Sequence, residues 1–555
     1  MTSGYSLGPD GFFRHGGRRF IPFGANWWPG SCGVELWQAW PVDEIRADLD
    51  LTRSLGMNCV RFFLRWQDFE PEPGRYDERC LARLAELLGW CRERGLAAHP
   101  ALFVGWMSGA IMWPAWRAGR NVFADPFMVE RGRAFARRVA AALAPFADTI
   151  LAVDQGNELC CLPDSGQASP AAVAAWCAAI NAAVREDYPG ALMISGNEHN
   201  QVISDSGWRL GAQPGCDLLS MHAYPVPTWH PLGFDGLTDP LAQELLPCYV
   251  ACARAFAPVL VQEFGTIVTF GTGQQDAYLR AILPACWDAG ANGFLWWCLR
   301  DIRAAIVPYV VNGFEGTLGL VDEAGKIKPG LESFLEFGRS LTERAAPTRD
   351  ARVALYWPDA WYPRDNPECP GNSPGDNARR LLIAHHLLRR LGHRPVVARR
   401  CDLGAVHTLV VAGAHLRTDE AAALADWVEA GGRLLVHGVD PVNWGPDYVR
   451  LFGAKPVDYR GPKPLAIAFA GDTWEMTNWP RGLRCELVAQ AAEVLARDQD
   501  GLPALLRHRL GAGAVVFTGA LVDDMPARVA SDRAARDRWT AWYRAVLAAL
   551  AAPAR

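Results

Sequence analysis

The chain has 555 residues, of which 50% are hydrophobic and 21% are charged, a composition typical of a globular protein with a large apolar core. At about 150 residues per domain, this length allows about three domains, or one large barrel with an appendage. The formal net charge of -5 leaves no basic excess for binding nucleic acid, and no stretch reaches the roughly 18 apolar residues of a membrane span.

The N-terminal segment and the cysteines bear on the cellular compartment. The first residues do not show a charged start followed by an apolar run, so we predict no secretory signal. The 15 cysteines are scattered and include no CxxC pair, which predicts neither a disulfide framework nor a structural zinc site. We therefore expect a cytoplasmic protein with reduced thiols, no metal and no cofactor. The sequence also contains no GxGxxG, P-loop, GxSxG or HExxH motif.

Residues 20 to about 340 repeat one order: a short apolar run, a loop, and a helical stretch rich in Ala and Leu. The expected strands are 20–24, 58–63, 96–103, 150–155, 192–195, 218–222, 259–262 and 293–296. The helices expected between them include 42–55, 80–94, 129–144 and 170–187. Because strands that alternate with helices pair in parallel, this pattern predicts an α/β fold, a (β/α)8 TIM barrel.

A polar segment at 338–352 predicts a linker to a second α/β region. In this region we expect strands at 353–356, 395–398, 408–412, 433–437 and 514–518, and helices at 376–391, 419–430 and 531–551. Short β-like runs between residues 445 and 512 predict a small β insertion. We therefore divide the chain into a barrel (1–345), an α/β domain (346–445), a β-rich insertion (446–512) and a return to the α/β domain (513–555).

Two of the expected barrel strands end in a glutamate. The run ILAVDQGNELC places Glu158 after the fourth strand, and APVLVQEFGT places Glu263 at the end of the seventh. Both side chains are expected at one mouth, because catalytic groups of such barrels lie at the carboxyl ends of the strands. Cleavage of a glycosidic bond needs one carboxyl group to protonate the leaving oxygen and a second to attack the anomeric carbon. We predict Glu158 as the acid/base and Glu263 as the nucleophile; for either residue alone, a helix cap or an arginine pair is the alternative.

Further candidates for binding substrate surround this pair. We expect Asn157 to donate a hydrogen bond to the sugar 2-hydroxyl, Arg61 to keep Glu263 ionised, and Tyr224 to hydrogen-bond Glu263. The remaining candidates are His222, Trp297, Trp28 and Trp106. Successive strand residues point in opposite directions, so only one of the adjacent tryptophans 296 and 297 can face the barrel. Glu198 and His199 also lie near the mouth but receive no role.

These motifs resemble the clan A glycoside hydrolases. The resemblance lies in GMNCVRFFLRWQDFEPEPGRYD, NE at 157–158, HAYP at 222–225, QEFG at 262–265 and the tryptophan of strand eight. FGANWWPG and the MSG of the strand-three loop are similar to intracellular exo-acting β-mannosidase-like members of family 5. The resemblance covers residues 15 to about 340 and implies a retaining exo-β-glycosidase of short oligosaccharides, most simply a β-mannosidase.

Alternatives remain open at this point. A β-galactosidase or β-glucosidase of the same clan would share these motifs, and Trp106 stands where we expect a histidine in β-mannosidase-like relatives. A barrel that binds carbohydrate without cleaving it is the alternative from another class. The loop containing GTLGLVDEAGKIKP after strand eight also resembles exo-acting members and implies a cleft that is closed at one end.

Residues 350–555 resemble the glutamine-amidotransferase-like domain that follows the barrel in some β-galactosidases, where it serves trimer assembly. The amidotransferase cysteine is not found after strand 408–412, where the sequence reads Gly413, Ala414, His415. The resemblance therefore implies a structural role only, and a homo-oligomer that by analogy would be a trimer.

Overall fold

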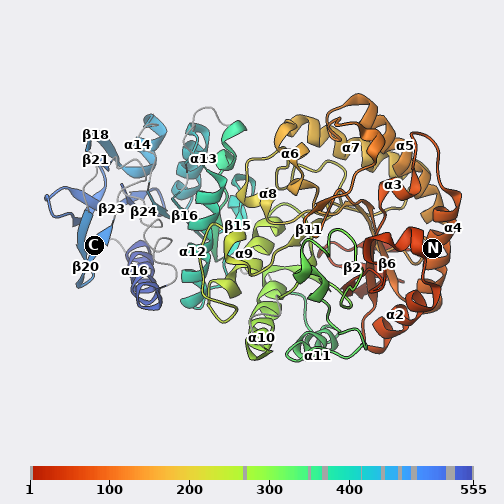
Figure 1. Cartoon of the computed structure of the whole chain (residues 1–555). Helices are drawn as coiled ribbons and strands as arrows, with labels where there is room; N and C mark the ends of the chain where they lie inside the picture. The colour runs from red at the N-terminus through yellow and green to blue at the C-terminus, as the bar shows by residue number, and fades with distance from the viewer. Residues whose placement is uncertain are drawn as a thin grey trace.

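The computed structural model describes residues 4–266, 272–347, 352–365, 373–413, 415–438, 444–460, 465–476, 484–519 and 532–552. Residues 348–351 of the expected linker and Ala414 lie outside this set. Figure 1 shows a barrel built from the N-terminal part of the chain beside a second α/β unit built from the C-terminal part. No helix in the described ranges is long and apolar enough to cross a membrane.

Eight parallel strands form the barrel. In chain order they are β4 (Phe23–Asn26), β5 (Cys59–Phe63), β6 (Ala97–Phe103), β9 (Val153–Gly156), β10 (Met193–Ile194), β11 (Leu219–His222), β12 (Val259–Phe264) and β13 (Ala291–Trp296). Consecutive strands from β4 to β10 and from β11 to β13 are hydrogen-bonded, and β13 pairs with β4. A parallel bridge between Ile194 and Leu218 joins β10 to the start of β11 and closes the circle. The predicted (β/α)8 barrel is confirmed.

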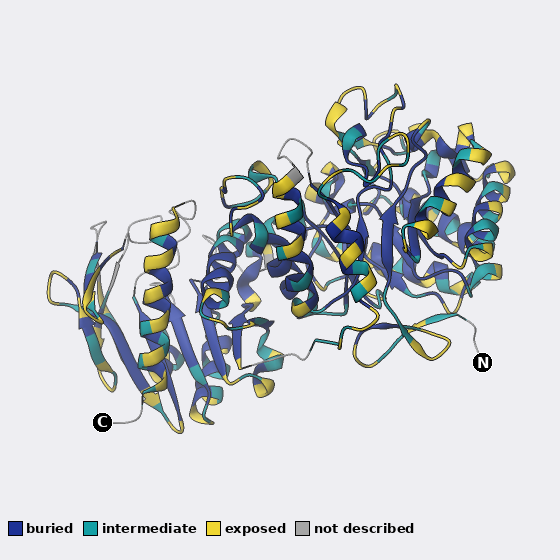
Figure 2. Cartoon of the chain, turned by 90° about the horizontal axis from the view of Figure 1, so that it is seen from below, coloured by how far each residue is buried: buried dark blue, intermediate teal, exposed yellow. Residues whose placement is uncertain are grey.

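Amphipathic helices cover the outside of the barrel (Figures 1 and 2). They include α2 (Val42–Ser54), α4 (Glu78–Glu93), α5 (Pro126–Leu143), α7 (Pro170–Asp187), α9 (Ala242–Arg254), α10 (Thr272–Ala289) and α11 (Glu332–Ser340). Helix α7 shows why they form where they do. The side chain of Ser169 accepts a hydrogen bond from the backbone of Ala172, and Pro170 occupies the first turn. The buried residues of α7, which include Val173, Trp176, Cys177, Ile180 and Val184, recur every three or four positions.

A small antiparallel sheet precedes the barrel. It consists of β1 (Tyr5–Leu7), β2 (Phe13–His15) and β3 (Arg18–Phe20). Phe13 is fully buried in one apolar cluster with Leu151, Leu260 and Leu295 of the barrel. The expected strand 20–24 is therefore divided between two sheets: β3 ends at Phe20 and the barrel strand begins at Phe23. This sheet covers the end of the barrel opposite the carboxyl ends of the strands.

The C-terminal unit is built on a seven-stranded sheet with the order β15, β14, β16, β17, β24, β23, β22. Its parallel strands are β14 (Val353–Tyr356), β15 (Val396–Ala398), β16 (Thr408–Ala412), β17 (Arg433–His437) and β24 (Gly513–Thr518). Strands β23 (Pro503–Leu510) and β22 (Glu493–Arg497) extend the sheet antiparallel. Its helices include α12 (Pro374–Arg390), α13 (Thr418–Glu429), α14 (Pro446–Phe452) and α16 (Arg533–Ala551).

Two hairpin-like strand pairs lie in the range where we expect the β insertion. One pairs β18 (Ala454–Arg460) with β21 (Arg484–Ala489), and the other pairs β19 (Leu465–Phe469) with β20 (Asp472–Met476). Because β22 and β23 belong to the main sheet, this β-rich range is partly continuous with the α/β unit.

Helix α12 packs against α9 and the short α8 (Asn200–Ile203) of the barrel, and strand β15 of the C-terminal sheet also contacts α9. In this contact the buried Glu244 of α9 receives hydrogen bonds from His385 Nδ1 at 2.6 Å and from Arg389 Nη1 at 3.1 Å. The indole of Trp361 donates to the backbone oxygen of Val202 at 2.8 Å. The two units are thus joined by buried polar contacts as well as by a shared apolar core.

Candidate active site

The two predicted glutamates meet at the carboxyl end of the barrel. Glu158 follows β9 and has a left-handed backbone (φ 49°, ψ 44°), and Glu263 lies near the end of β12. A carboxylate oxygen of Glu158 lies within 4.8 Å of one of Glu263. This spacing matches retaining glycosidases, whose carboxyl groups are about 5–5.5 Å apart, rather than inverting ones at about 6.5–9.5 Å.

His222, the last residue of β11, lies between the two glutamates. Its Nδ1 is 2.9 Å from Glu158 Oε1 and 3.7 Å from Glu263 Oε2, and its Nε2 is 2.8 Å from Oε1 of Gln262. Burial lowers the pKa of His222. The ring is therefore neutral and carries one proton, and its neighbours determine on which nitrogen that proton sits.

The side chain of Gln262 fixes this proton. Its amide nitrogen donates to Asp154 Oδ2 at 3.0 Å and lies 2.7 Å from His99 Nε2, so its amide oxygen faces His222. An amide oxygen only accepts, so Nε2 of His222 carries the hydrogen and Nδ1 is an acceptor. The partner of Nδ1 must then be a donor. The network is therefore satisfied when Glu158 is protonated.

Glu263, in contrast, is held by two donors. The hydroxyl of Tyr224 donates to its Oε1 at 2.7 Å, and Arg61 Nη1 donates to its Oε2 at 3.2 Å. Arg61 is fully buried and also binds Oδ2 of Asp154 through Nε at 3.0 Å and Nη2 at 2.7 Å. The same Nη2 donates to Asn157 Oδ1 at 3.0 Å. The guanidinium thus holds Glu263, Asp154 and Asn157 from beneath the cavity.

The neighbours of the two glutamates also give the two side chains different pKa values. Burial, together with the charge of Glu198, raises the pKa of Glu158 to about 8. Burial and the charge of Glu158 raise the pKa of Glu263 to about 7, while the Arg61 guanidinium and the hydrogen bond from Tyr224 act in the opposite direction. Since donors stabilise the carboxylate of Glu263, a single proton shared by the pair resides on Glu158.

A cavity of about 610 Å³ opens above this pair, a size typical of small-molecule sites. Both glutamates line it, together with the predicted residues Asn157, His222, Tyr224, Trp297 and Trp106. Trp297 faces the cavity, whereas Trp296 packs in the core against Phe264 and Phe334. Strand alternation predicts such a division of the two tryptophans.

Two predicted residues lie behind the cavity surface. Arg61 reaches the site only through the side chains that it orients. Trp28 is buried and stacks on Phe63 with ring centroids 5.2 Å apart, and Phe63 in turn meets the ring of Trp297 edge-on at 5.8 Å. Trp28 therefore supports the cavity wall through Phe63 and is not among the residues that line it.

Three residues meet on one side of the cavity, and the contacts between them were not predicted from the sequence. We call Ser108, Asn312 and Glu315 the latch. Ser108 Oγ donates to Glu315 Oε2 at 3.0 Å, and Asn312 Nδ2 donates to the backbone oxygen of Ser108 at 2.7 Å. Burial raises the pKa of Glu315 to about 7.

The latch joins two distant loops. Ser108 turns the hairpin of β7 (Trp106–Met107) and β8 (Ala110–Ile111) after β6, whereas Asn312 and Glu315 belong to the loop after β13, at the 3-10 helix η7 (Gly313–Thr317). Strands β5 and β4 lie between β6 and β13 in the barrel, so the latch spans this part of the mouth. The MSG motif and the loop after strand eight are the sequence features that could have pointed to this contact.

The other side of the cavity carries residues from the loops after β9, β10 and β11. They include Cys161, Glu198, His199, Asn200 and Trp229. Although burial opposes it, the adjacent His199 imidazolium lowers the pKa of Glu198 to about 2. This wall therefore places a second, ionised carboxylate close to Glu158. The sequence showed Glu198 and His199 near the mouth, but not their pairing.

The chain was compared with known proteins. A scan against family models and a search of curated proteins found no match. Among solved structures, the chain is similar to the exo-β-1,4-mannosidase Op5Man5 from Opitutaceae bacterium strain TAV5, with 50% identity over 97% of this chain and 99% of that chain and a TM-score of 0.93. The chain belongs to glycoside hydrolase family 5.

More distant structures share the fold of this glycoside hydrolase. A GH5_18 protein from Streptomyces cattleya in complex with GlcNAc is 24% identical over 71% of this chain and 98% of that one, with a TM-score of 0.62. A catalytic mutant of Gan42B, a GH42 β-galactosidase from G. stearothermophilus, is 14% identical over 95% of this chain and 88% of that one, with a TM-score of 0.69. The second structure matches both units, barrel and C-terminal domain, in one chain.

Proposed function

We propose that this family 5 hydrolase is a retaining exo-β-mannosidase that removes terminal β-mannosyl residues from short oligosaccharides. The observation that carries the proposal is the approach of Glu158 and Glu263 to within 4.8 Å across one cavity. The mannosidase activity of the relative at 50% identity supports mannose as the cleaved sugar. β-Galactosidase and β-glucosidase activities are the alternatives that substrate tests must exclude.

In the first step, protonated Glu158 gives its proton to the glycosidic oxygen while Glu263 attacks the anomeric carbon. The bond to the leaving group breaks, the leaving group departs as an alcohol, and a covalent glycosyl ester forms on Glu263. In the second step, Glu158 takes a proton from water, and the water oxygen attacks the anomeric carbon and releases Glu263. The sugar leaves with its original anomeric configuration after two inversions.

The surrounding residues serve these steps. Arg61 and Tyr224 hold Glu263 ionised and aimed at the cavity, and Tyr224 must release its hydrogen bond when the ester forms. Asn157 is positioned by Arg61, and its Nδ2 donates to the backbone oxygen of Trp106 at 2.9 Å. It is our candidate for binding the sugar 2-hydroxyl. Trp297 and Trp106 offer ring faces to the sugar.

The latch explains why cleavage would be confined to chain ends. Because it bridges the mouth above β5 and β4, we expect it to block a polymer that would otherwise continue through the cleft. The leaving group would then extend along the opposite wall, near Glu198 and Trp229.

The decisive test compares aryl β-mannoside, β-glucoside and β-galactoside as substrates of the intact chain and of two variants. We expect the β-mannoside to have the highest kcat/KM. Glu263→Ala should lose turnover, and azide should restore it with formation of α-mannosyl azide. Glu158→Ala should keep activity on substrates with good leaving groups, and azide should give β-mannosyl azide. Full activity of Glu263→Ala would overturn the assignment, and preference for another sugar would change the substrate.

Three further expectations from the sequence remain proposals. We propose that the enzyme acts in the cytoplasm; every cysteine whose side chain is described is a free thiol, as reducing conditions require. We propose a homo-oligomer, with a trimer as the first state to test by light scattering. We also propose the division of the chain into a catalytic barrel (1–345), an α/β domain (346–445), a β-rich insertion (446–512) and a return to the α/β domain (513–555).

A further inference from the structure

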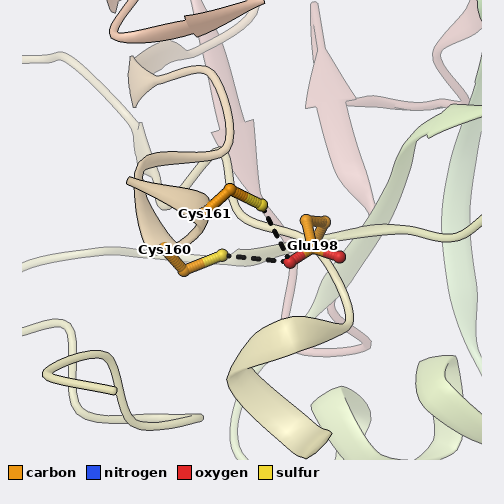
Figure 3. Close-up of side chains that lie close together, drawn as sticks. All are labelled: Cys160, Cys161 and Glu198. Atoms are coloured by element: carbon orange, nitrogen blue, oxygen red, sulfur yellow. Dashed lines mark hydrogen bonds between the residues drawn. The ribbon is translucent and has the colours of Figure 1, made fainter. Parts of the chain in front are cut away.

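Two adjacent cysteines and a distant glutamate form a compact cluster in the cavity wall (Figure 3). The thiols of Cys160 and Cys161 both donate to Oε1 of Glu198, each at an S···O distance of 3.3 Å. The cysteines lie in the 3-10 helix η4 (Leu159–Cys161) after β9, and Glu198 follows β10. Although adjacent in sequence, the two side chains therefore converge on a single oxygen atom.

The three donor atoms lie where the ligands of a tetrahedral cation would lie. All three are within 4.8 Å of one another. With Zn–S bonds of about 2.3 Å and Zn–O bonds of about 2.0–2.2 Å, a tetrahedral ion separates its ligand atoms by about 3.5–3.8 Å. The observed S···O distances need to lengthen by only a few tenths of an ångström to admit the ion.

We propose that Cys160, Cys161 and Glu198 form a site for one thiophilic divalent cation, such as Zn2+, in the wall of the active-site cavity. The two thiols supply sulfur ligands and Glu198 supplies an oxygen ligand. The fourth position faces the cavity and is filled by water. Three protein ligands with one open position form a known arrangement for zinc.

The carboxylate of the cluster is held by its neighbours. Oε1 of Glu198 also accepts a hydrogen bond from the backbone N–H of Asn200 at 2.8 Å, and Oε2 pairs with His199. These contacts hold the carboxylate in place as residues around metal ligands do. Binding is a ligand exchange that balances: the cation replaces the two thiol protons, which pass to the buffer, and no electron is transferred.

The ion has a path to this site and a means of affecting catalysis. Cys161 and Glu198 both line the cavity, so a cation in solvent can reach them. The backbone N–H of Cys161 donates to the backbone oxygen of Glu158 at 2.9 Å, so η4 is tied to the residue that we propose as acid/base. A bound ion therefore fixes this turn and occupies the side of the cavity where the leaving group would lie. We expect reversible inhibition, an effect that rests on the proposed function.

Binding can be tested without reference to activity. Cd2+ chloride is titrated into the reduced, full-length chain, and the ultraviolet sulfur-to-cadmium charge-transfer absorption is recorded. We expect saturation at one Cd2+ per chain and displacement by Zn2+. The Cys160→Ser/Cys161→Ser double variant should lose this absorption, and Glu198→Gln should bind more weakly. Cys401→Ser is the matched control, since Cys401 is an exposed thiol far along the chain, and it should bind as the unaltered chain does.

Two results would overturn the proposal: no charge-transfer absorption in the unaltered chain, or equal absorption in the double variant. If the double variant does not fold, the single variant Cys161→Ser, whose thiol is half-buried at the cavity, provides the same comparison. Loss of even a residue that only orients a ligand costs about 10–100-fold in metal affinity. Removal of a ligand should therefore raise the Zn2+ concentration that gives half-inhibition at least about tenfold. The Cd2+ titration does not depend on turnover, so it would still report binding if the chain proved to lack glycosidase activity.

Discussion

Gln262 and His222 share a hydrogen bond of 2.8 Å that determines the protonation of the whole site. Because the Gln262 amide nitrogen is committed to Asp154 and His99, its oxygen must accept from Nε2 of His222. Nδ1 of His222 can then only accept, and it faces Glu158. The proton is directed to Glu158, while Glu263, held by Arg61 and Tyr224, is left as the carboxylate.

The first prediction concerns the acid side of the pH profile. The pKa of Glu263 is raised to about 7, chiefly by burial, and only the ionised form can attack the anomeric carbon. We therefore expect kcat/KM for an aryl β-mannoside to fall as the pH drops below about 7. Melting temperatures measured over the same range separate this effect from unfolding. A profile that stays flat down to the ordinary pKa of a glutamate, about 4.3, would contradict it.

The second prediction concerns Tyr224→Phe, which removes one donor from Glu263. A hydrogen bond to a charged group contributes about 1.5–3 kcal/mol, so kcat/KM should fall by about 10- to 150-fold with little change in melting temperature. The lost donor also favours the protonated carboxyl group, so the acid limb should move to higher pH. Tyr76→Phe is the control, since the Tyr76 hydroxyl bonds Arg131 at 3.1 Å and does not line the cavity. Equal losses of kcat/KM in both variants would contradict the role of Tyr224 as a hydrogen-bond donor to Glu263.

The repeating units were readable from the sequence because each strand is an apolar run and each helix has its own periodicity. The site positions of Glu158 and Glu263 followed from the same rule, since both end such runs. The assignment failed at Phe20, which is apolar like a barrel residue but ends a separate hairpin strand. Nothing in its immediate sequence distinguishes burial at the base of the barrel from burial inside it.

The contacts that shape the cavity were harder to predict. Ser108 and Glu315 are 207 positions apart, and Cys160 and Glu198 are 38 apart. Polar loop residues follow no period, so their partners depend on how the loops fold over the mouth. The role of Gln262 could not be predicted for the same reason. In the sequence it is simply the residue before Glu263, and only the positions of His99 and Asp154 show which way its amide faces.

The third prediction concerns the latch. Gly109 has a φ of 87°, and a Cβ built there would lie 2.2 Å from Nδ2 of Asn312. In Gly109→Ala, Asn312 must move away and lose its hydrogen bond to Ser108, worth about 0.5–1.5 kcal/mol. We expect a KM for short β-mannosides that is raised up to about tenfold, and some cleavage of internal linkages in a long β-mannan.

The control for this variant is Gly119→Ala. Gly119 has a similar φ of 78° but nothing within 4 Å of an added Cβ, so it reproduces the backbone strain without the clash. Its KM and product pattern should match those of the unaltered chain. If the two variants release the same products in the same proportions, the latch does not confine the enzyme to chain ends.

The fourth prediction concerns the contact between the barrel and the C-terminal unit. Against the effect of burial, His385, His386 and Arg389 hold the pKa of Glu244 well below its usual value. Because the pKa of Glu244 is lower in the folded state than in the unfolded state, its ionised form stabilises the fold. This stabilisation is fully present above about pH 4.3, the pKa of a glutamate in the unfolded chain, and it is lost as the pH falls below that value. Glu244→Gln leaves buried donors without their anion, and such losses cost about 3–5 kcal/mol.

We therefore expect Glu244→Gln to melt at a clearly lower temperature at neutral pH, and the difference from the unaltered chain to shrink as the pH falls below about 4.3. Glu336→Gln is the matched control, because Glu336 pairs with Arg280 in solvent and its side chain is 49% exposed. Such pairs contribute about 0–1 kcal/mol, so its melting temperature should hardly change. A Glu244→Gln melting curve that coincides with that of Glu336→Gln at neutral pH would show that the buried cluster does not hold the two units together. A difference that stays constant as the pH falls would instead attribute the loss to packing rather than to the charge of Glu244.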